Sequence, residues 1–101
     1  IINAKILEAM QPHARLINIA RGDVVDEAAL IKVLQEERIG GAGLDVYEFE
    51  PDVPQTLRDL DNVVLLPHLG TSTREVRVDM GRMVVENLQA ALRGDAPPNV
   101  V

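Results

Sequence analysis

The sequence predicts an α/β fold in which helices flank a mostly parallel sheet. Three short, aliphatic runs alternate with amphipathic segments along the chain. With one Phe, one Tyr and no Trp in 101 residues, the core must be aliphatic. Runs of this kind are typical of strands that helices cover on both faces. The length allows one domain at most.

The first half of the chain alternates helix and strand. Asn3 has the side chain of an N-cap, and the sequence predicts a helix from it to residue 10. A second helix is predicted to begin at residues 26–27 and to stop at Gly40-Gly41. The strands are predicted at residues 16–19 and 43–46.

The second half contains a loop, a strand and the longest helix. Residues 48–61 hold two prolines among acids and predict a surface loop with one short turn. The strand at 63–66 should stop at Pro67, which cannot donate to a central ladder. Ser72 and Glu75 have the spacing of a capping box for a helix that runs to Gly94. Three strands make a small sheet, so further chain or a second copy is expected to cover it.

Composition excludes several classes of function. A net charge of -6 without a Lys/Arg cluster argues against a nucleic-acid surface. We expect no membrane segment, because no apolar stretch is long enough. The absence of cysteine fits a reducing, cytoplasmic setting. No acidic group has metal-loop spacing, so we predict no metal site.

Polar residues follow all three predicted strands. Arg21 follows the first strand, Asp45 closes the second, His68 follows the third, and Glu50 lies five residues past Asp45. Ligands bind outside the carboxyl ends of strands in open α/β sheets. Taken singly, each residue has an ordinary structural interpretation: a solvated arginine, an exposed histidine, a loop glutamate and an aspartate that caps a turn.

Three longer segments carry more specific information. They are NIARGDVVDEAAL at 18–30, GAGLDVYEFEP at 41–51 and NVVLLPHLGTST at 62–73. In order and spacing they resemble the signature blocks of D-isomer-specific 2-hydroxyacid dehydrogenases, over nearly the whole chain. The last block leans towards the phosphoglycerate-dehydrogenase branch, to which glyoxylate and hydroxypyruvate reductases are close.

The resemblance assigns roles to individual residues. It implies that Arg21 binds the substrate, that Glu50 is the carboxylate partner and that His68 is the acid/base. It implies NAD as the cofactor, with NADP as the alternative, and a small 2-hydroxy or 2-keto acid as the substrate. The cofactor-side contacts that it implies are Ile19, Ala20, Arg21, Asp45, His68, Gly70 and Thr71.

These residue types suit the implied reaction. Hydride transfer to a 2-keto acid places negative charge on the carbonyl oxygen, and an imidazole of pKa about 6.5 is a suitable proton donor. A carboxylate such as Glu50 would orient that imidazole. The two-pronged guanidinium of Arg21 suits a substrate carboxylate, and Asp45 could accept from the nicotinamide carboxamide.

The resemblance also sets what we expect outside the sequence. The family's Gly-rich phosphate turn has no counterpart here, so residues 1–101 are expected to be the C-terminal portion of a Rossmann-like dinucleotide-binding domain. Residues 94–101 would lead towards a separate catalytic domain. We expect a homodimer, and little activity from this chain alone.

Two other classes of protein share the pattern. The main alternative is a dinucleotide-sensing interaction protein similar to the C-terminal-binding corepressors, which share the fold. A formate dehydrogenase is disfavoured, because that group resembles the pattern with glutamine where Glu50 stands.

Overall fold

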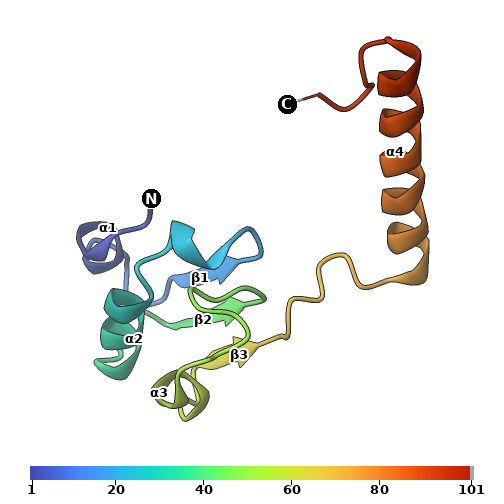
Figure 1. The fold of residues 1–101 in the computed structure, drawn as a ribbon. Helices are drawn as coiled ribbons and strands as arrows, with labels where there is room; N and C mark the ends of the chain where they lie inside the picture. Colours follow the sequence, from blue (N-terminus) through green and yellow to red (C-terminus); the bar gives the residue numbers. More distant parts are fainter. Residues whose placement is uncertain (101) are drawn as a thin grey trace. The chain divides into compact units, whose positions relative to one another are not determined.

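The computed structural model describes residues 1–100, which form two compact units. The first unit comprises residues 1–70, and the second begins at Thr71. The first unit contains the sheet, three α-helices and a short 3-10 helix, whereas the second contains one long α-helix (Figure 1).

The sheet of the first unit has three parallel strands in the order β1-β2-β3 (Figure 1). β1 spans Arg15–Asn18, β2 spans Gly41–Leu44 and β3 spans Val63–Leu65. The predicted α/β fold with a parallel sheet is therefore confirmed, and the bounds of two strands differ from the prediction by one residue.

The second strand begins two residues before its predicted start. Gly41 has a φ of 146°, and a Cβ there would collide with the carbonyl oxygen of Asn62. The neighbouring Ala42 N–H donates to that same carbonyl at 3.0 Å. Gly41 therefore starts the strand instead of stopping the helix, because only glycine lets the two backbones approach this closely.

Two predicted helices are present in the first unit. α1 spans Ala4–Glu8, and the Asn3 side chain caps it as predicted by accepting from the Ile6 N–H at 3.1 Å. α2 spans Glu27–Gln35, and Asp26 caps it by accepting from the Ala29 N–H at 2.9 Å.

The predicted end of α2 at Gly40 was wrong. The helix ends at Gln35, and Glu37 takes the left-handed conformation, with a φ of 51°. The Arg38 N–H then donates back to the Val33 carbonyl at 2.9 Å. This is a Schellman closure with glutamate in the position that glycine usually occupies, which is why residue type did not reveal it.

The loop between β2 and β3 contains a short helix, α3, at Gln55–Arg58. Its Leu57 is fully buried in the core. A short 3-10 helix, η1, at Gly22–Val24 follows β1. The predicted turn within the loop is thus a helical turn that packs on the sheet.

The core lies between α1, α2, α3 and one face of the sheet. Alternation along the strands places Leu16, Ala42 and Val63 in one row on this face. The intervening row, Ile17-Gly43-Val64, lies on the opposite face, where the side chains of Ile17 and Val64 are about two-thirds exposed, at 66% and 64%. Within residues 1–70, helices therefore cover one face of the sheet, whereas the sequence predicted helices on both faces. That further chain or a second copy covers the other face stays a prediction.

The second unit consists mainly of α4, at Arg74–Arg93. The predicted Ser72 capping box was wrong, because Thr73 is the N-cap and its Oγ1 accepts from the Val76 N–H at 3.3 Å. The predicted stop at Gly94 is confirmed, with a left-handed φ of 80°. Apolar side chains along α4, such as Met80 and Met83, are exposed in this chain. No helix within residues 1–100 is long and apolar enough to cross a membrane.

Candidate active site

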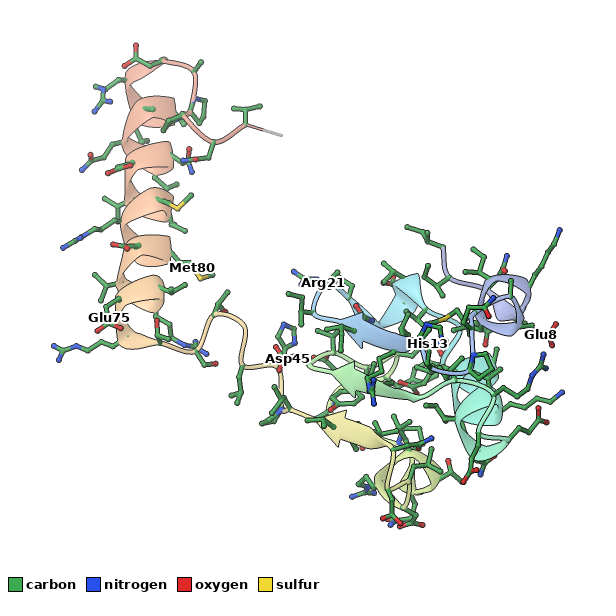
Figure 2. All side chains as sticks on the ribbon, turned by 180° about the vertical axis from the view of Figure 1, so that it is seen from behind. Glu8, His13, Arg21, Asp45, Glu75 and Met80 are labelled. Atoms are coloured by element: carbon green, nitrogen blue, oxygen red, sulfur yellow. The ribbon has the colours of Figure 1, made fainter. Side chains whose placement is uncertain are left out.

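The carboxyl ends of the three strands bring the predicted polar residues to one edge of the sheet. Arg21 lies after β1, Asp45 directly after β2 and His68 three residues after β3. All three strands are parallel, so these positions share an edge, as the sequence predicted. Figure 2 shows Arg21 and Asp45 at this end of the sheet.

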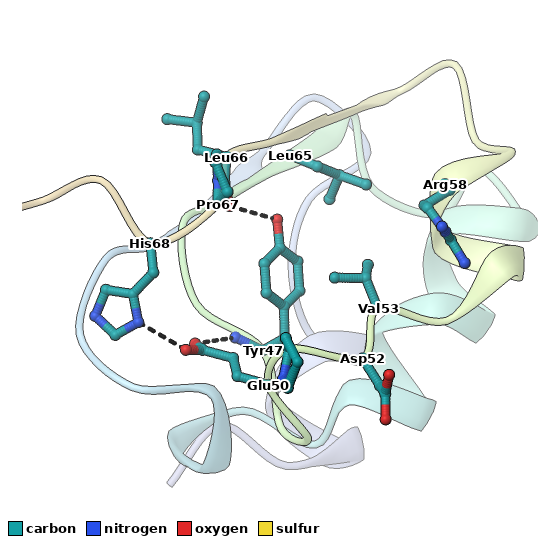
Figure 3. A pocket seen from close by; sticks show the side chains of 10 residues that line it. Tyr47, Glu50, Asp52, Val53, Arg58, Leu65, Leu66, Pro67 and His68 are labelled. Atoms are coloured by element: carbon teal, nitrogen blue, oxygen red, sulfur yellow. Dashed lines mark hydrogen bonds and ion pairs between the residues drawn. The ribbon is translucent and has the colours of Figure 1, made fainter. Parts of the chain in front are cut away.

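His68 and Glu50 form a hydrogen-bonded pair at this edge. The His68 Nδ1 lies 2.7 Å from a Glu50 carboxylate oxygen, and both side chains are partly exposed (Figure 3). The other Glu50 oxygen accepts from the Tyr47 N–H at 3.0 Å. The hydrogen bond from His68 and then that from Tyr47 lower the pKa of the Glu50 carboxyl, so it is ionised near neutral pH.

His68 has a backbone conformation that is uncommon for a residue with a side chain. Its φ is 56°, in the left-handed region. The next two amide groups, of Leu69 and Gly70, donate to the two carboxylate oxygens of Asp45 at 2.6 and 2.8 Å. Asp45 is buried, with 4% of its surface exposed. Both of its oxygens therefore bind the chain segment that carries His68.

Arg21 is exposed at the end of a short loop whose shape Asn18 fixes. The buried Asn18 side chain accepts from the Ala20 N–H at 3.1 Å and donates to the Arg21 carbonyl at 2.9 Å. The Arg21 guanidinium donates to the Ala20 carbonyl at 2.7 Å. Sequence reasoning missed Asn18. The feature that could have indicated its role is an amide side chain at the end of an otherwise apolar strand, because a buried amide needs hydrogen-bond partners nearby.

The Arg21 loop is packed against the loop after β2. A Cβ at Gly22 would collide with the backbone of Tyr47 and Glu48, so only glycine fits there. The buried Glu27 carboxylate accepts from the Glu48 N–H at 3.2 Å. These contacts tie the loop that bears Arg21 to the loop that bears Glu50.

Tyr47 is a second residue that sequence reasoning missed. It is buried, and its hydroxyl lies 2.8 Å from the Leu66 carbonyl oxygen and 3.2 Å from that of Leu44. Burial raises the pKa of the Tyr47 phenol above its ordinary value of 10.0. The feature that could have indicated its role is that the one tyrosine of the sequence follows a buried strand. A buried tyrosine hydroxyl usually has a hydrogen-bond partner, so a contact of this kind could be expected.

A pocket of about 440 Å³ opens beside the His68–Glu50 pair (Figure 3). One end is polar, where His68 and Glu50 meet, and aliphatic side chains form much of the rest. Its lining residues are Tyr47, Glu50, Pro51, Asp52, Val53, Arg58, Leu65, Leu66, Pro67 and His68.

The residues expected on the cofactor side lie at the same edge, apart from one. Ile19 and Ala20 are exposed after β1, with Ile19 at 74%, and Gly70 contacts Asp45. Thr71 begins the second unit. Ile19 and Asp45 directly follow the neighbouring strands β1 and β2. An exposed aliphatic side chain and a carboxylate at adjacent strand ends suit a flat ring that carries an amide, so the residues present fit a nicotinamide group. Within residues 1–100, no group of three or more acidic or histidine side chains is placed to hold a metal ion.

Comparison with known proteins identifies a family. Residues 1–70 match the family described as D-isomer specific 2-hydroxyacid dehydrogenase, NAD binding domain. The chain is 54% identical over 100 residues to a glyoxylate reductase of Pyrococcus furiosus, covering 99% of this chain and 30% of that protein. It is 53% identical to a hydroxyphenylpyruvate reductase of Plectranthus scutellarioides, covering 93% of this chain and 30% of that protein. The chain thus spans about a third of the length of these curated relatives.

Solved structures show the same fold. A 2-hydroxyacid dehydrogenase from Ketogulonicigenium vulgare is 42% identical, with a TM-score of 0.90 over 100% of this chain and 32% of that chain. An NADPH-dependent glyoxylate/hydroxypyruvate reductase from Sinorhizobium meliloti, in complex with NADP and malonate, is 49% identical. Its TM-score is 0.86, over 88% of this chain and 28% of that chain.

Proposed function

We propose, since this chain belongs to the family of D-isomer specific 2-hydroxyacid dehydrogenases, that the protein carrying it is an oxidoreductase. It transfers a hydride between a nicotinamide cofactor and a D-2-hydroxy acid or the corresponding 2-keto acid. Support comes from relatives that are named reductases and dehydrogenases. These names favour an enzyme over a dinucleotide-sensing interaction protein.

The observation that carries the proposal is the His68–Glu50 pair at the carboxyl edge of the sheet. With Nδ1 directed at Glu50, 2.7 Å away, the His68 ring presents Nε2 to the surroundings. We assign the proton to Nδ1 in the neutral ring, because a carboxylate accepts. In the protonated ring, Nε2 then delivers its proton to the carbonyl oxygen of the keto acid during reduction. In the oxidative direction Nε2 removes the hydroxyl proton.

Glu50 orients the His68 ring, because its carboxylate lies 2.7 Å from Nδ1. The carboxylate has a lowered pKa, so it stays ionised while the imidazole gains and loses its proton. Replacing Glu50 with Gln keeps a hydrogen-bond acceptor but removes the charge. We expect that variant mainly to change the pH profile of turnover.

Arg21 holds the carboxylate of the substrate. Its guanidinium is exposed and donates one hydrogen bond within residues 1–100, to the Ala20 carbonyl, so donors remain for a ligand. A planar guanidinium can grip a carboxylate with two parallel hydrogen bonds, which fixes the keto acid relative to His68. The loop fixed by Asn18 keeps Arg21 in place.

Within the first unit, the proposed cofactor side of the site comprises Ile19, Ala20, Asp45 and Gly70, together with Arg21 and His68; Thr71, which the resemblance adds, belongs to the second unit. When bound, a nicotinamide cofactor supplies or accepts the hydride. Ile19 would offer apolar surface to the ring, and Asp45, whose two oxygens each accept one backbone amide, would offer a remaining lone pair to the carboxamide. We propose NAD or NADP, because the family is described as NAD binding and one similar structure holds NADP.

The substrate is a small 2-keto acid, with glyoxylate and hydroxypyruvate as the first choices, since similar proteins are named for their reduction. We further propose that residues 1–101 are the C-terminal portion of a dinucleotide-binding domain, with residues 94–101 leading towards a catalytic domain. The protein would act as a homodimer in the cytoplasm.

The test uses the full-length protein that carries this chain. Loss of reduced NAD or NADP absorbance is followed with glyoxylate, hydroxypyruvate and pyruvate, beside the His68→Ala variant. We expect turnover by the wild type and near-complete loss in the variant. No turnover of any 2-keto acid, or an unchanged rate in the variant, would falsify the proposal. The 101-residue chain alone is expected to show little or no turnover.

A further inference from the structure

The segment that carries His68 is held by one short stretch of chain at three points. The loop after β2, residues 45–50, contacts residues 66–70 through three side chains. Asp45 binds two amide groups, the Tyr47 hydroxyl binds the Leu66 carbonyl and Glu50 binds the His68 ring. The ring and the backbone of His68 therefore have separate supports.

Asp45 supports the backbone. It accepts from the Leu69 N–H at 2.6 Å and from the Gly70 N–H at 2.8 Å, one bond to each carboxylate oxygen. Hydrogen bonds to an ionised acceptor are short and strong, and Asp45 is 4% exposed, so water competes little for them. The two amide groups cannot rotate while both bonds are made.

The residue directly before these amide groups has the strained backbone. His68 has a φ of 56°, in the left-handed region. Glycine adopts this region freely, and asparagine, aspartate and histidine adopt it occasionally, but it is uncommon for any residue with a side chain. Such a conformation persists where its surroundings over-determine it. Gly70 permits the close approach, because a Cβ there would lie 3.3 Å from a carboxylate oxygen of Asp45.

We infer that Asp45 is a positioning residue that fixes His68 in its left-handed conformation by binding the Leu69 and Gly70 amides. The inference rests on the proposed function, in which His68 is the acid/base, and assigns Asp45 a second role besides the cofactor side. Glu50 then sets the orientation of the imidazole ring, whereas Asp45 sets the position of the backbone from which the side chain extends.

A double-mutant cycle in the full-length protein separates this role from direct contact with the cofactor. Asp45→Asn keeps the shape but places an amide NH2 against one of the two N–H donors. A residue that acts through His68 has no further effect once His68 is gone. In the background with wild-type His68, we therefore expect Asp45→Asn to lower kcat about 100-fold. This is the order of loss seen when a reacting group is displaced by about 1 Å. Beside His68→Ala the same change should alter kcat less than about twofold.

The cofactor readout distinguishes the two roles further. The Kd of reduced cofactor, measured by fluorescence titration, reads the cofactor-side role separately: its rise in Asp45→Asn should be smaller than the loss of kcat and equal in the two His68 backgrounds. Asp61→Asn, at an exposed carboxyl before β3, is the matched control and should leave both quantities unchanged. An equal loss of kcat in both backgrounds, or a cofactor Kd that rises in step with it, would overturn the inference.

A second variant covers the case in which Asp45→Asn does not fold. Asp45→Glu keeps the charge but moves both oxygens by one methylene, and it should show the same loss confined to the His68 background. If His68→Ala itself retains turnover, the proposed function fails. If His68→Ala is inactive and both Asp45 variants keep full kcat, only the inference fails.

Discussion

Tyr47→Phe tests whether a single buried hydroxyl joins the ends of two strands below the candidate site. The substitution removes one oxygen and leaves the ring, so the surrounding packing is preserved. In the structure that oxygen lies 2.8 Å from the Leu66 carbonyl and 3.2 Å from the Leu44 carbonyl. Leu66 comes two residues before His68, so the bond anchors the segment that carries the acid/base.

The expected loss follows from what each carbonyl keeps. The Leu44 carbonyl retains a partner in the variant, because the Leu66 N–H donates to it at 2.8 Å. The hydrogen bond to the Leu66 carbonyl is only part-buried, so we expect water to replace the lost hydroxyl there. Only one net hydrogen bond disappears, and the free energy of unfolding should fall by about 1 kcal/mol. For a domain of 150–250 residues this corresponds to a decrease in Tm of about 2–4 °C.

The pH dependence of that loss has a fixed sign. Burial raises the pKa of the Tyr47 phenol in the folded state above 10.0, its ordinary value. A group whose pKa is raised in the folded state contributes its full stabilisation at pH values below its pKa in the unfolded state. That contribution is lost as the pH rises through its pKa in the folded state. The difference in stability between wild type and Tyr47→Phe should therefore be constant below pH 10.0 and shrink above it.

Thermal unfolding of the full-length protein at neutral and alkaline pH measures both effects. Thr56→Val is the matched control, since it removes an exposed hydroxyl on α3 and should change stability by less than about 0.5 kcal/mol. A Tyr47→Phe variant as stable as wild type at neutral pH would refute the reasoning. So would a difference that widens above pH 10.0.

Four further substitutions test the site. His68→Ala should lower kcat by about 100-fold or more, measured with a 2-keto acid and reduced cofactor. Glu50→Gln removes a carboxyl whose pKa lies below 4.5, so wild-type Tm should fall on acidification below that pH and the variant's should fall less. Arg21→Lys should raise KM for the keto acid by about tenfold, since one point charge replaces a two-pronged donor. Gly22→Ala should lower Tm by more than an exposed substitution does, because its Cβ meets the Tyr47 and Glu48 backbone.

The sequence predicted the sheet and its functional edge because both depend on local features. Short aliphatic runs and Pro67 located the strand ends, and the parallel pairing then brought Arg21, Asp45 and His68 to one edge. The start of β2 was predicted less well, because the collision between a Cβ at Gly41 and the Asn62 carbonyl involves residues 21 positions apart. Helix ends failed where an unusual residue took the key conformation, as Glu37 did in closing α2.

The supports of the site could not be read from residue type. Asp45 accepts hydrogen bonds from two backbone amides more than 20 positions away, and the Tyr47 hydroxyl donates to a carbonyl 19 positions away. Neither bond leaves a local pattern, since a carboxylate or phenol after a strand fits many environments equally well. The His68–Glu50 pair was predicted through resemblance to a family, and the distance of 2.7 Å then came from the structure.

The arrangement explains how a partly exposed pair can still be precisely placed. His68 and Glu50 lie where substrate can reach them, and an exposed ion pair contributes little stability of its own. Precision must come from neighbours that water does not reach. Asp45 and Tyr47 are buried and bind the backbone on either side of His68. The accessible imidazole ring is therefore attached to a backbone frame, residues 66–70, that buried side chains hold in place. Changes to the frame should therefore alter the rate of reaction even where the pair itself is intact.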